Sequence, residues 1–267
     1  SVTRQANVPM IAFSTDSNVA GRGVYLLSFL PESDISQIVA YAASQGKQSF
    51  AALLPNTSYG TLVEGALRQA AARHGGRVVA IERYPLDRQG MMAPAQRLSE
   101  AAKGATAQAD AILIPDGPNV IPALAPLLAL NGVDTRRVKL LGSGQWADEK
   151  VRKEPSVAGG WYPAPSPAGW EDFKTKFQET YGSEPPRIAS IAYDAVNLAS
   201  ALATLPPQQR FAAATLTNPN GFAGVDGIFR FRSNGLNERG LAILEVKSGG
   251  DTKVLKEAPS AFGAESF

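Results

Sequence analysis

"SFAALLPNTSYGTLVEGALRQAAARHG", residues 49–75, contains one complete strand–helix unit. The apolar run 49–55 is typical of a strand that is buried on both faces, and the polar loop 56–60 follows it. The helix expected next ends at Gly75, a common residue after a helix C-terminus. Similar units continue to about residue 146, with apolar runs at 77–85, 109–117 and 137–146 alternating with helical patterns. This alternation predicts an α/β fold with a doubly wound parallel sheet, which has helices on both faces.

The segments on either side of these repeats follow other patterns. Residues 8–13, VPMIAF, form an apolar run that breaks into the polar residues 14–18. We expect a buried parallel strand there, ending at the sheet edge where α/β proteins hold ligands. Residues 156–170 read as a strand end and an extended connector, and two helices follow. Alternating apolar residues and a Ser-Asn-Gly turn within 225–246 predict an antiparallel hairpin.

Composition limits the classes of function. Of the 267 residues, 44% are hydrophobic and 19% are charged, values typical of a globular protein with a sizeable core. The net charge is +2 and the basic residues are scattered, which argues against binding to nucleic acid through charge. Cysteine is absent, and the single histidine, His74, lies at an expected helix end. We therefore expect no disulfide, no thiolate metal site and no cysteine nucleophile.

Three loops are candidate ligand sites. Ser14, Thr15 and Asp16 place small hydroxyls and a carboxylate at a strand end, although such residues also favour turns and helix caps. The loop 56–60 has the same layout before Tyr59. Trp161 and Tyr162 lie beside the connector, where either a ligand contact or core packing explains large aromatic residues.

Signals for catalysis and for nucleotide binding are weak. Two G-x-G stretches lack both a third glycine and a following lysine, so no nucleotide fingerprint is present. The sequence contains no G-x-S-x-G motif and no histidine placed to activate a serine. The carboxylates are dispersed. We expect a protein that is not an enzyme, with no catalytic residues, no metal and no cofactor.

The order of four segments resembles the type I periplasmic ligand-binding proteins, the branched-chain amino-acid (Leu/Ile/Val) receptor family. These segments are VPMIAFSTD, FAALLPNTSYG, PPRIASIAYDAVNLASAL and GVDGIFRFRSNGLNERGLAILEV. The resemblance covers nearly the whole chain. Within the superfamily, LLGSGQWAD and FRFRSNGLNERGLAILEV look most like the LppC-type lipoproteins, which activate penicillin-binding proteins.

The resemblance implies two lobes, each with a mostly parallel sheet and helices on both faces. It places residues 1–31 and 164–226 in the first lobe, and residues 32–163 and 227–267 in the second. Family members have about 100 residues of strand–helix repeats before the strand found here at residue 8. On this comparison the sequence lacks that region, and the first lobe is expected to be incomplete.

The resemblance also implies a function without chemistry. The chain is expected to be an extracytoplasmic, periplasmic receptor that captures a small polar ligand, such as an amino acid, in an interlobe cleft and serves an ABC transporter permease. The alternative is a lipoprotein, anchored through the absent N-terminal region, that activates a cell-wall synthase of the penicillin-binding type by protein–protein contact. No nucleic-acid partner and no transmembrane segment are expected. The ligand-binding positions carried over from the family are Ser14, Thr15, Asp16, Tyr59, Asp116, Trp161 and Tyr162.

Overall fold

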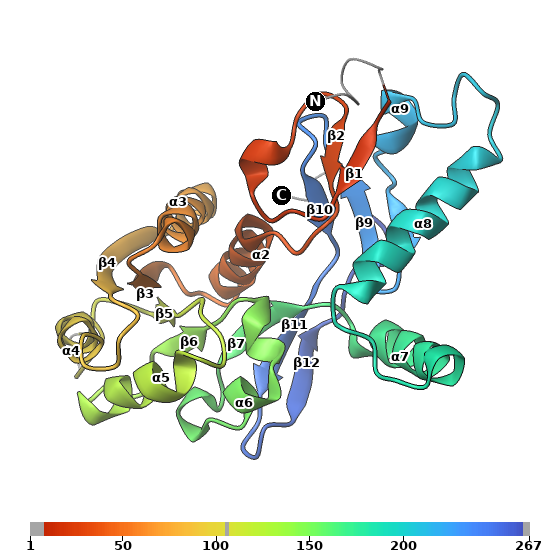
Figure 1. Cartoon of the computed structure of the whole chain (residues 1–267). Coiled ribbons are helices and arrows are strands. Elements are labelled where there is room, and N and C mark those ends of the chain that lie inside the picture. The colour runs from red at the N-terminus through yellow and green to blue at the C-terminus, as the bar shows by residue number, and fades with distance from the viewer. Residues whose placement is uncertain (1–7, 105–106, 264–267) are drawn as a thin grey trace. The chain divides into compact units, whose positions relative to one another are not determined.

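The computed structural model describes residues 8–104 and 107–263 (Figure 1). The chain divides into two compact units, and each is described by itself. Unit 1 comprises Ser1–Leu30, Pro165–Leu241 and Glu257–Phe267, and unit 2 comprises Pro31–Ala164 and Ala242–Lys256. The boundaries at Leu30–Pro31 and Ala164–Pro165 each lie one residue from the lobe boundaries expected from the sequence.

The C-terminal third differs from the expected division. Residues 227–241 and 257–267, expected in the second lobe, belong to unit 1. The reason is hydrophobic packing: the buried rings of Phe229 and Phe231 join one core cluster with Tyr25, Leu27 and Ile191. Residues 242–256 then return to unit 2, where they extend its sheet.

Unit 2 is built on a seven-stranded sheet with the order β12-β11-β7-β6-β5-β3-β4. Five neighbouring strands are parallel, and the last two strands along the chain add to one edge in antiparallel pairing. The strands are β3 (Ser49–Pro55), β4 (Arg77–Tyr84), β5 (Ala111–Leu113), β6 (Lys139–Leu141), β7 (Trp161–Ala164), β11 (Ala242–Val246) and β12 (Thr252–Lys256). The parallel sheet expected from the strand–helix alternation is thereby confirmed.

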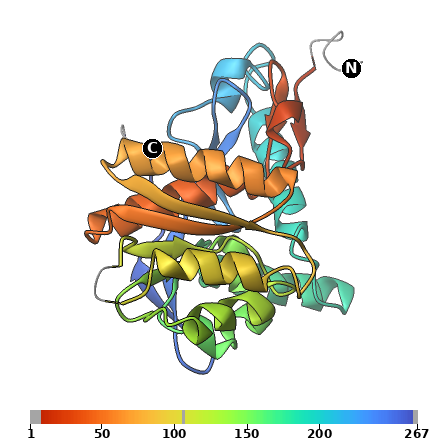
Figure 2. The same cartoon turned by 90° about the vertical axis from the view of Figure 1, so that its left-hand side faces the viewer.

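Helices cover both faces of this sheet. Figure 2 shows α3 on one side of the sheet of unit 2 and α4 on the other. The helices of this unit are α2 (Pro31–Ser44), α3 (Ser58–Arg73), α4 (Met92–Glu100), α5 (Ile121–Leu130) and α6 (Glu149–Arg152), with 3₁₀ turns η2 (Gly144–Ala147) and η3 (Pro155–Val157). Pro122 near the start of α5 suits a helix start because the first N–H groups of a helix have no intrahelical partner.

The core of unit 2 follows from the alternation of β3. Every residue of β3 is buried, so the strand has no solvent-facing side. Phe50, Ala52 and Leu54 point toward α2 and α3, where they pack with Ile38 and Leu67. Burial of this apolar surface is the main force that fixes the two helices on the sheet.

Unit 1 combines two small sheets with helices. β1 (Met10–Ala12) and β2 (Val24–Leu26) pair in parallel, and β8 (Phe222–Gly224), β9 (Gly227–Phe231) and β10 (Asn237–Arg239) pair in antiparallel fashion. The hairpin expected in this part of the sequence is therefore confirmed as β9–β10. The helices are α7 (Pro167–Tyr181), α8 (Ala189–Ala203) and α9 (Ala213–Leu216), with the 3₁₀ turn η1 (Ser17–Val19). Parallel pairing in unit 1 is confined, within the described residues, to β1 and β2. No helix in the described part of the chain is both long and apolar enough to cross a membrane.

Candidate ligand-binding site

The loops that follow β3, β5 and β6 lie at one edge of the unit 2 sheet, because parallel strands end at the same edge. Three side chains from these loops meet there. Tyr59 comes from the first turn of α3, Asp116 follows β5, and Gln145 lies in η2 after β6. We call this edge of the unit 2 sheet the carboxyl edge.

Tyr59 is held by two hydrogen bonds. Its hydroxyl donates to the carbonyl oxygen of Pro115 (3.1 Å) and accepts from Nε2 of Gln145 (3.1 Å). Burial raises the pKa of Tyr59 to about 12, so the hydroxyl stays protonated at neutral pH. Steric crowding requires glycine at the next position, because a Cβ at Gly60 would collide with the carbonyl oxygen of Pro55. The Tyr-Gly pair therefore lets α3 begin directly against the end of β3.

Asp116 is linked to the end of a neighbouring strand. The hydroxyl of Tyr84, the last residue of β4, donates a hydrogen bond to Oδ2 of Asp116. Burial raises the pKa of the Asp116 carboxyl, while the bond from Tyr84 lowers it. Burial and the nearby Asp116 also raise the pKa of Tyr84, which is fully buried. The carboxyl of Asp116 is thus fixed in position at the carboxyl edge.

The loop after β6 completes the carboxyl edge. The Ser143 hydroxyl donates to the Pro115 carbonyl oxygen (2.5 Å), and the Gly144 N–H donates to Oδ2 of Asp34 (2.8 Å). Ser143, Gln145 and Asp34 were not among the site residues expected from the sequence. One feature of the sequence points to Ser143 and Gln145. Residues 142–145 follow an apolar run, as do the candidate loops 14–18 and 56–60. Asp34 gives no such signal, since it lies inside α2.

Trp161 and Tyr162 do not join the carboxyl edge. The Trp161 ring packs edge-on against Tyr41 (5.2 Å between centroids), and the ammonium nitrogen of Lys139, the first residue of β6, lies 4.8 Å from the ring centre. The ring therefore lies toward the amino end of β6. Tyr162 is 1% exposed, and burial raises its pKa to about 12. Both residues pack in unit 2, which is the core-packing alternative noted for them in the sequence.

In unit 1, the loop after β1 carries Ser14, Thr15 and Asp16. Oδ1 of Asp16 accepts hydrogen bonds from the N–H of Asn18 (3.0 Å) and from its Nδ2 (2.9 Å), so Asp16 caps η1. The Ser14 hydroxyl oxygen accepts from the Asp16 N–H (3.0 Å). Thr15 and Asp16 are exposed. The loop thus has the capping role that these residue types favour, and it also presents polar atoms to solvent.

A family model described as "Periplasmic binding protein" matches residues 1–251. The chain belongs to the periplasmic binding protein family. This family is one of substrate-binding, non-catalytic proteins that lie outside the cytoplasm. A search of curated protein sequences found no match.

Solved structures agree with this periplasmic binding protein fold. An ABC transporter substrate-binding protein from Sphaerobacter thermophilus superimposes with a TM-score of 0.74 at 18% identity, over 96% of this chain and 74% of that one. A solute binding protein from R. palustris in complex with benzoate gives 0.69 at 16% identity, over 99% and 75%. A leucine binding protein from Thermotoga maritima gives 0.67 at 17% identity, over 100% and 76%. At these identities the likeness shows the fold.

The charges at the carboxyl edge of this periplasmic binding protein are acidic. Asp34 and Asp116 both raise the pKa of Tyr59 through their charge, which places both carboxyls near its hydroxyl. Arg83, on the adjacent strand β4, is paired with Glu64 (2.7 Å). Within the described residues, no group of three or more histidine, cysteine, aspartate or glutamate side chains is arranged to hold a metal ion.

Proposed function

We propose that this periplasmic binding protein is an extracytoplasmic solute receptor that captures an amino acid or a related small polar molecule for an ABC transporter permease. One observation carries the proposal. In a chain of this family, Tyr59, Asp116 and Gln145 come together at the carboxyl edge, with their positions fixed by hydrogen bonds. Polar groups held in place before a ligand arrives lose little entropy on binding, which favours affinity.

The chemistry of this edge suits a ligand with an amino group. An ammonium donates three hydrogen bonds, and the carboxyls of Asp34 and Asp116 are nearby acceptors. The Tyr59 ring offers an apolar surface beside them. From unit 1 we include the hydroxyls of Ser14 and Thr15 and the carboxylate of Asp16 as further ligand-binding groups. Trp161 and Tyr162 are left out of the proposed site because Tyr162 is buried in unit 2 and Trp161 packs against the core cluster.

The compared structures support a receptor over the alternative, an activator of penicillin-binding proteins. Those named above are described as an ABC transporter substrate-binding protein, a solute binding protein and a leucine binding protein. Two are described by a ligand, benzoate in one case and leucine in the other. These two compounds therefore belong in any test set beside the common amino acids.

The test is a thermal-shift screen of the purified chain against the common amino acids and benzoate, followed by calorimetric titration of each compound that shifts the melting temperature. A ligand at 100 times its dissociation constant is expected to add about 2.7 kcal/mol to the free energy of unfolding. Tyr59→Phe removes the hydroxyl from the carboxyl edge and is expected to weaken binding about tenfold. Tyr41→Phe is the matched control, because Tyr41 packs against Trp161 instead.

Two results would contradict the proposal. One is the absence of a shift with every compound in the set. The other is a binding compound whose affinity is unchanged by Tyr59→Phe and by Asp116→Asn, since the ligand would then bind elsewhere.

A further inference from the structure

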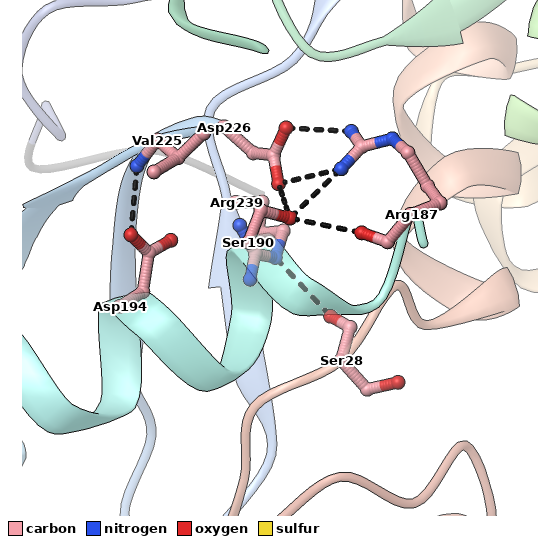
Figure 3. Close-up of polar contacts among 7 residues, drawn as sticks. All are labelled: Ser28, Arg187, Ser190, Asp194, Val225, Asp226 and Arg239. Atoms are coloured by element: carbon pink, nitrogen blue, oxygen red, sulfur yellow. Dashed lines mark hydrogen bonds and ion pairs between the residues drawn. The ribbon is translucent and has the colours of Figure 1, made fainter. Parts of the chain in front are cut away.

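A charged cluster in unit 1 contacts residues that lie close, along the chain, to the points where the chain leaves that unit. The chain passes between the units at Leu30–Pro31, Ala164–Pro165, Leu241–Ala242 and Lys256–Glu257. Phe29, Trp170 and Arg239 each lie within six residues of one of the first three connections. Phe29 and Trp170 contact Arg187, which pairs with Asp226, and Arg239 contacts Phe29. Figure 3 shows the pair of Arg187 and Asp226 together with Arg239.

The centre of the cluster is a two-point ion pair. Nη1 of Arg187 donates to Oδ2 of Asp226 (3.0 Å), and Nη2 donates to Oδ1 (2.5 Å). The Ser190 hydroxyl also donates to Oδ2 of Asp226 (2.7 Å). The Asp226 side chain is completely buried, whereas the Arg187 side chain is 43% exposed. The flat guanidinium is therefore held in one orientation by a fixed carboxylate.

Arg187 holds two aromatic rings from distant parts of the chain. Its guanidinium carbon lies 4.9 Å from the ring centre of Phe29 and 4.4 Å from that of Trp170, distances at which a cation attracts an aromatic face. Phe29 immediately precedes the first connection, and Trp170 follows the second in the first turns of α7. A single side chain thus contacts the unit 1 ends of two connections.

Arg239 adds the third connection. Its guanidinium carbon lies 4.7 Å from the ring centre of Phe29, and its Nε donates to the carbonyl oxygen of Ser28 (3.2 Å). Nδ2 of Asn237 donates to the same carbonyl (2.9 Å). The segment 28–29 is therefore attached to β10, whose end at Arg239 comes just before the connection at Leu241–Ala242.

We propose that the ion pair of Arg187 and Asp226, together with Arg239 on the same Phe29 ring, is a positioning device that fixes the unit 1 ends of three connections. Any rearrangement linked to ligand binding then takes place in the short segments beyond Phe29, Trp170 and Arg239. Arg187 is then a positioning residue and not a ligand contact. The link to ligand binding rests on the proposed function. The fixing of the connections does not, and it is tested without a ligand. Short segments next to fixed groups are where hinge rotations concentrate in proteins.

The test compares amide hydrogen exchange in the full chain, in Arg187→Lys and in a matched control, Arg232→Lys. Lysine keeps the charge of Arg187 but loses the two-point bond and the flat stacking surface. Arg232 has a 44% exposed side chain and pairs with the buried Glu238 (3.0 Å), so the control removes a similar pair away from Phe29 and Trp170. We expect exchange in segments 28–33, 163–170 and 239–244 to become about tenfold faster in Arg187→Lys, with β3 and β9 unchanged.

In the control, Arg232→Lys, we expect the rate of amide hydrogen exchange to change only around the β9–β10 turn. Faster exchange throughout unit 1 in Arg187→Lys, or unchanged exchange in the three segments, would overturn the proposal. A second readout is the dissociation constant of L-leucine, or of whichever compound binds in the screen. It is expected to weaken about tenfold in Arg187→Lys and to stay within about twofold in Arg232→Lys. Equal affinities in the two variants would overturn the link to binding. If no compound binds the wild-type chain, the proposed function fails and the exchange result still decides the fixing of the connections.

Discussion

Asp226 is completely buried and is paired at two points with Arg187, a residue 39 positions earlier in the chain. The Arg187 side chain, by contrast, is 43% exposed to solvent. Such a pair gains little from its charges alone, because desolvation offsets the attraction. The pair matters mainly because loss of Arg187 would leave Asp226 as a buried carboxylate without a cation.

Replacing Arg187 with alanine is therefore expected to lower the free energy of unfolding by about 3 kcal/mol, since an unpaired buried charge is strongly unfavourable. Urea unfolding followed by circular dichroism measures the change. Arg136→Ala is the control: Arg136 is 91% exposed and pairs with the partly exposed Asp134. Its effect is expected to be below about 1 kcal/mol. Equal effects of the two substitutions would show that burial of Asp226 does not matter.

Asp194 makes the stability of unit 1 depend on pH. Burial raises its pKa to about 6, with Asp226 raising it further and Arg239 and Arg187 lowering it. The folded chain thus holds this proton more tightly than the unfolded chain, whose aspartates titrate near pH 4. As pH rises from about 4 to about 6, this difference in pKa lowers the free energy of unfolding. At neutral pH the total reduction is about 3 kcal/mol.

Asp194→Asn removes this titration and keeps an oxygen that can accept from the Val225 N–H, a bond of 2.8 Å in the wild type. We expect the variant to gain stability relative to the wild type as pH rises from 4 to 7. Unfolding measured at several pH values tests this. Asp172→Asn, which makes the same substitution at an exposed position on α7, is the control. A flat difference for Asp194→Asn would contradict the expectation.

Tyr84→Phe is expected to raise the pKa of Asp116, because the hydrogen bond from Tyr84 lowers it in the wild type. The partly buried Asp116 carboxyl and the core around Tyr84 also lose a hydrogen bond, which is expected to reduce the free energy of unfolding by about 1 kcal/mol. Carbon NMR of the Asp116 carboxyl across a pH titration gives the pKa directly. Tyr162→Phe, which removes another buried hydroxyl of unit 2, should leave that titration unchanged.

Gly142→Ala is expected to destabilise unit 2 by about 1–3 kcal/mol, since overpacking a filled core displaces its neighbours. A Cβ at Gly142 would overlap the indole ring of Trp146, which is fully buried and donates from Nε1 to the Ile114 carbonyl oxygen (3.0 Å). Gly65→Ala is the opposite case, because the space around Gly65 on α3 is empty within 4 Å. There alanine should stabilise the helix by about 1 kcal/mol. Melting temperatures of both variants distinguish the two effects.

Sequence pattern alone determined the parallel sheet and the hairpin. The apolar run 49–55 and its repeats have the length and spacing of buried parallel strands, and each is followed by a local helical pattern. The turn of the β9–β10 hairpin is likewise encoded within a few residues. These features depend on neighbours along the chain, so periodicity and turn residues are sufficient to predict them.

The contacts that build the sites were decided by tertiary structure. Gln145 reaches Tyr59 across 86 positions, and Asp34 reaches Gly144 across 110. Trp161 is partly buried against the core because Tyr41 of α2 packs on its ring, which its own sequence does not reveal. The joining of residues 227–241 to unit 1 depends in the same way on Phe229 and Phe231 meeting Tyr25. Pairings between distant residues follow from how whole elements pack, and a local pattern carries no information about them.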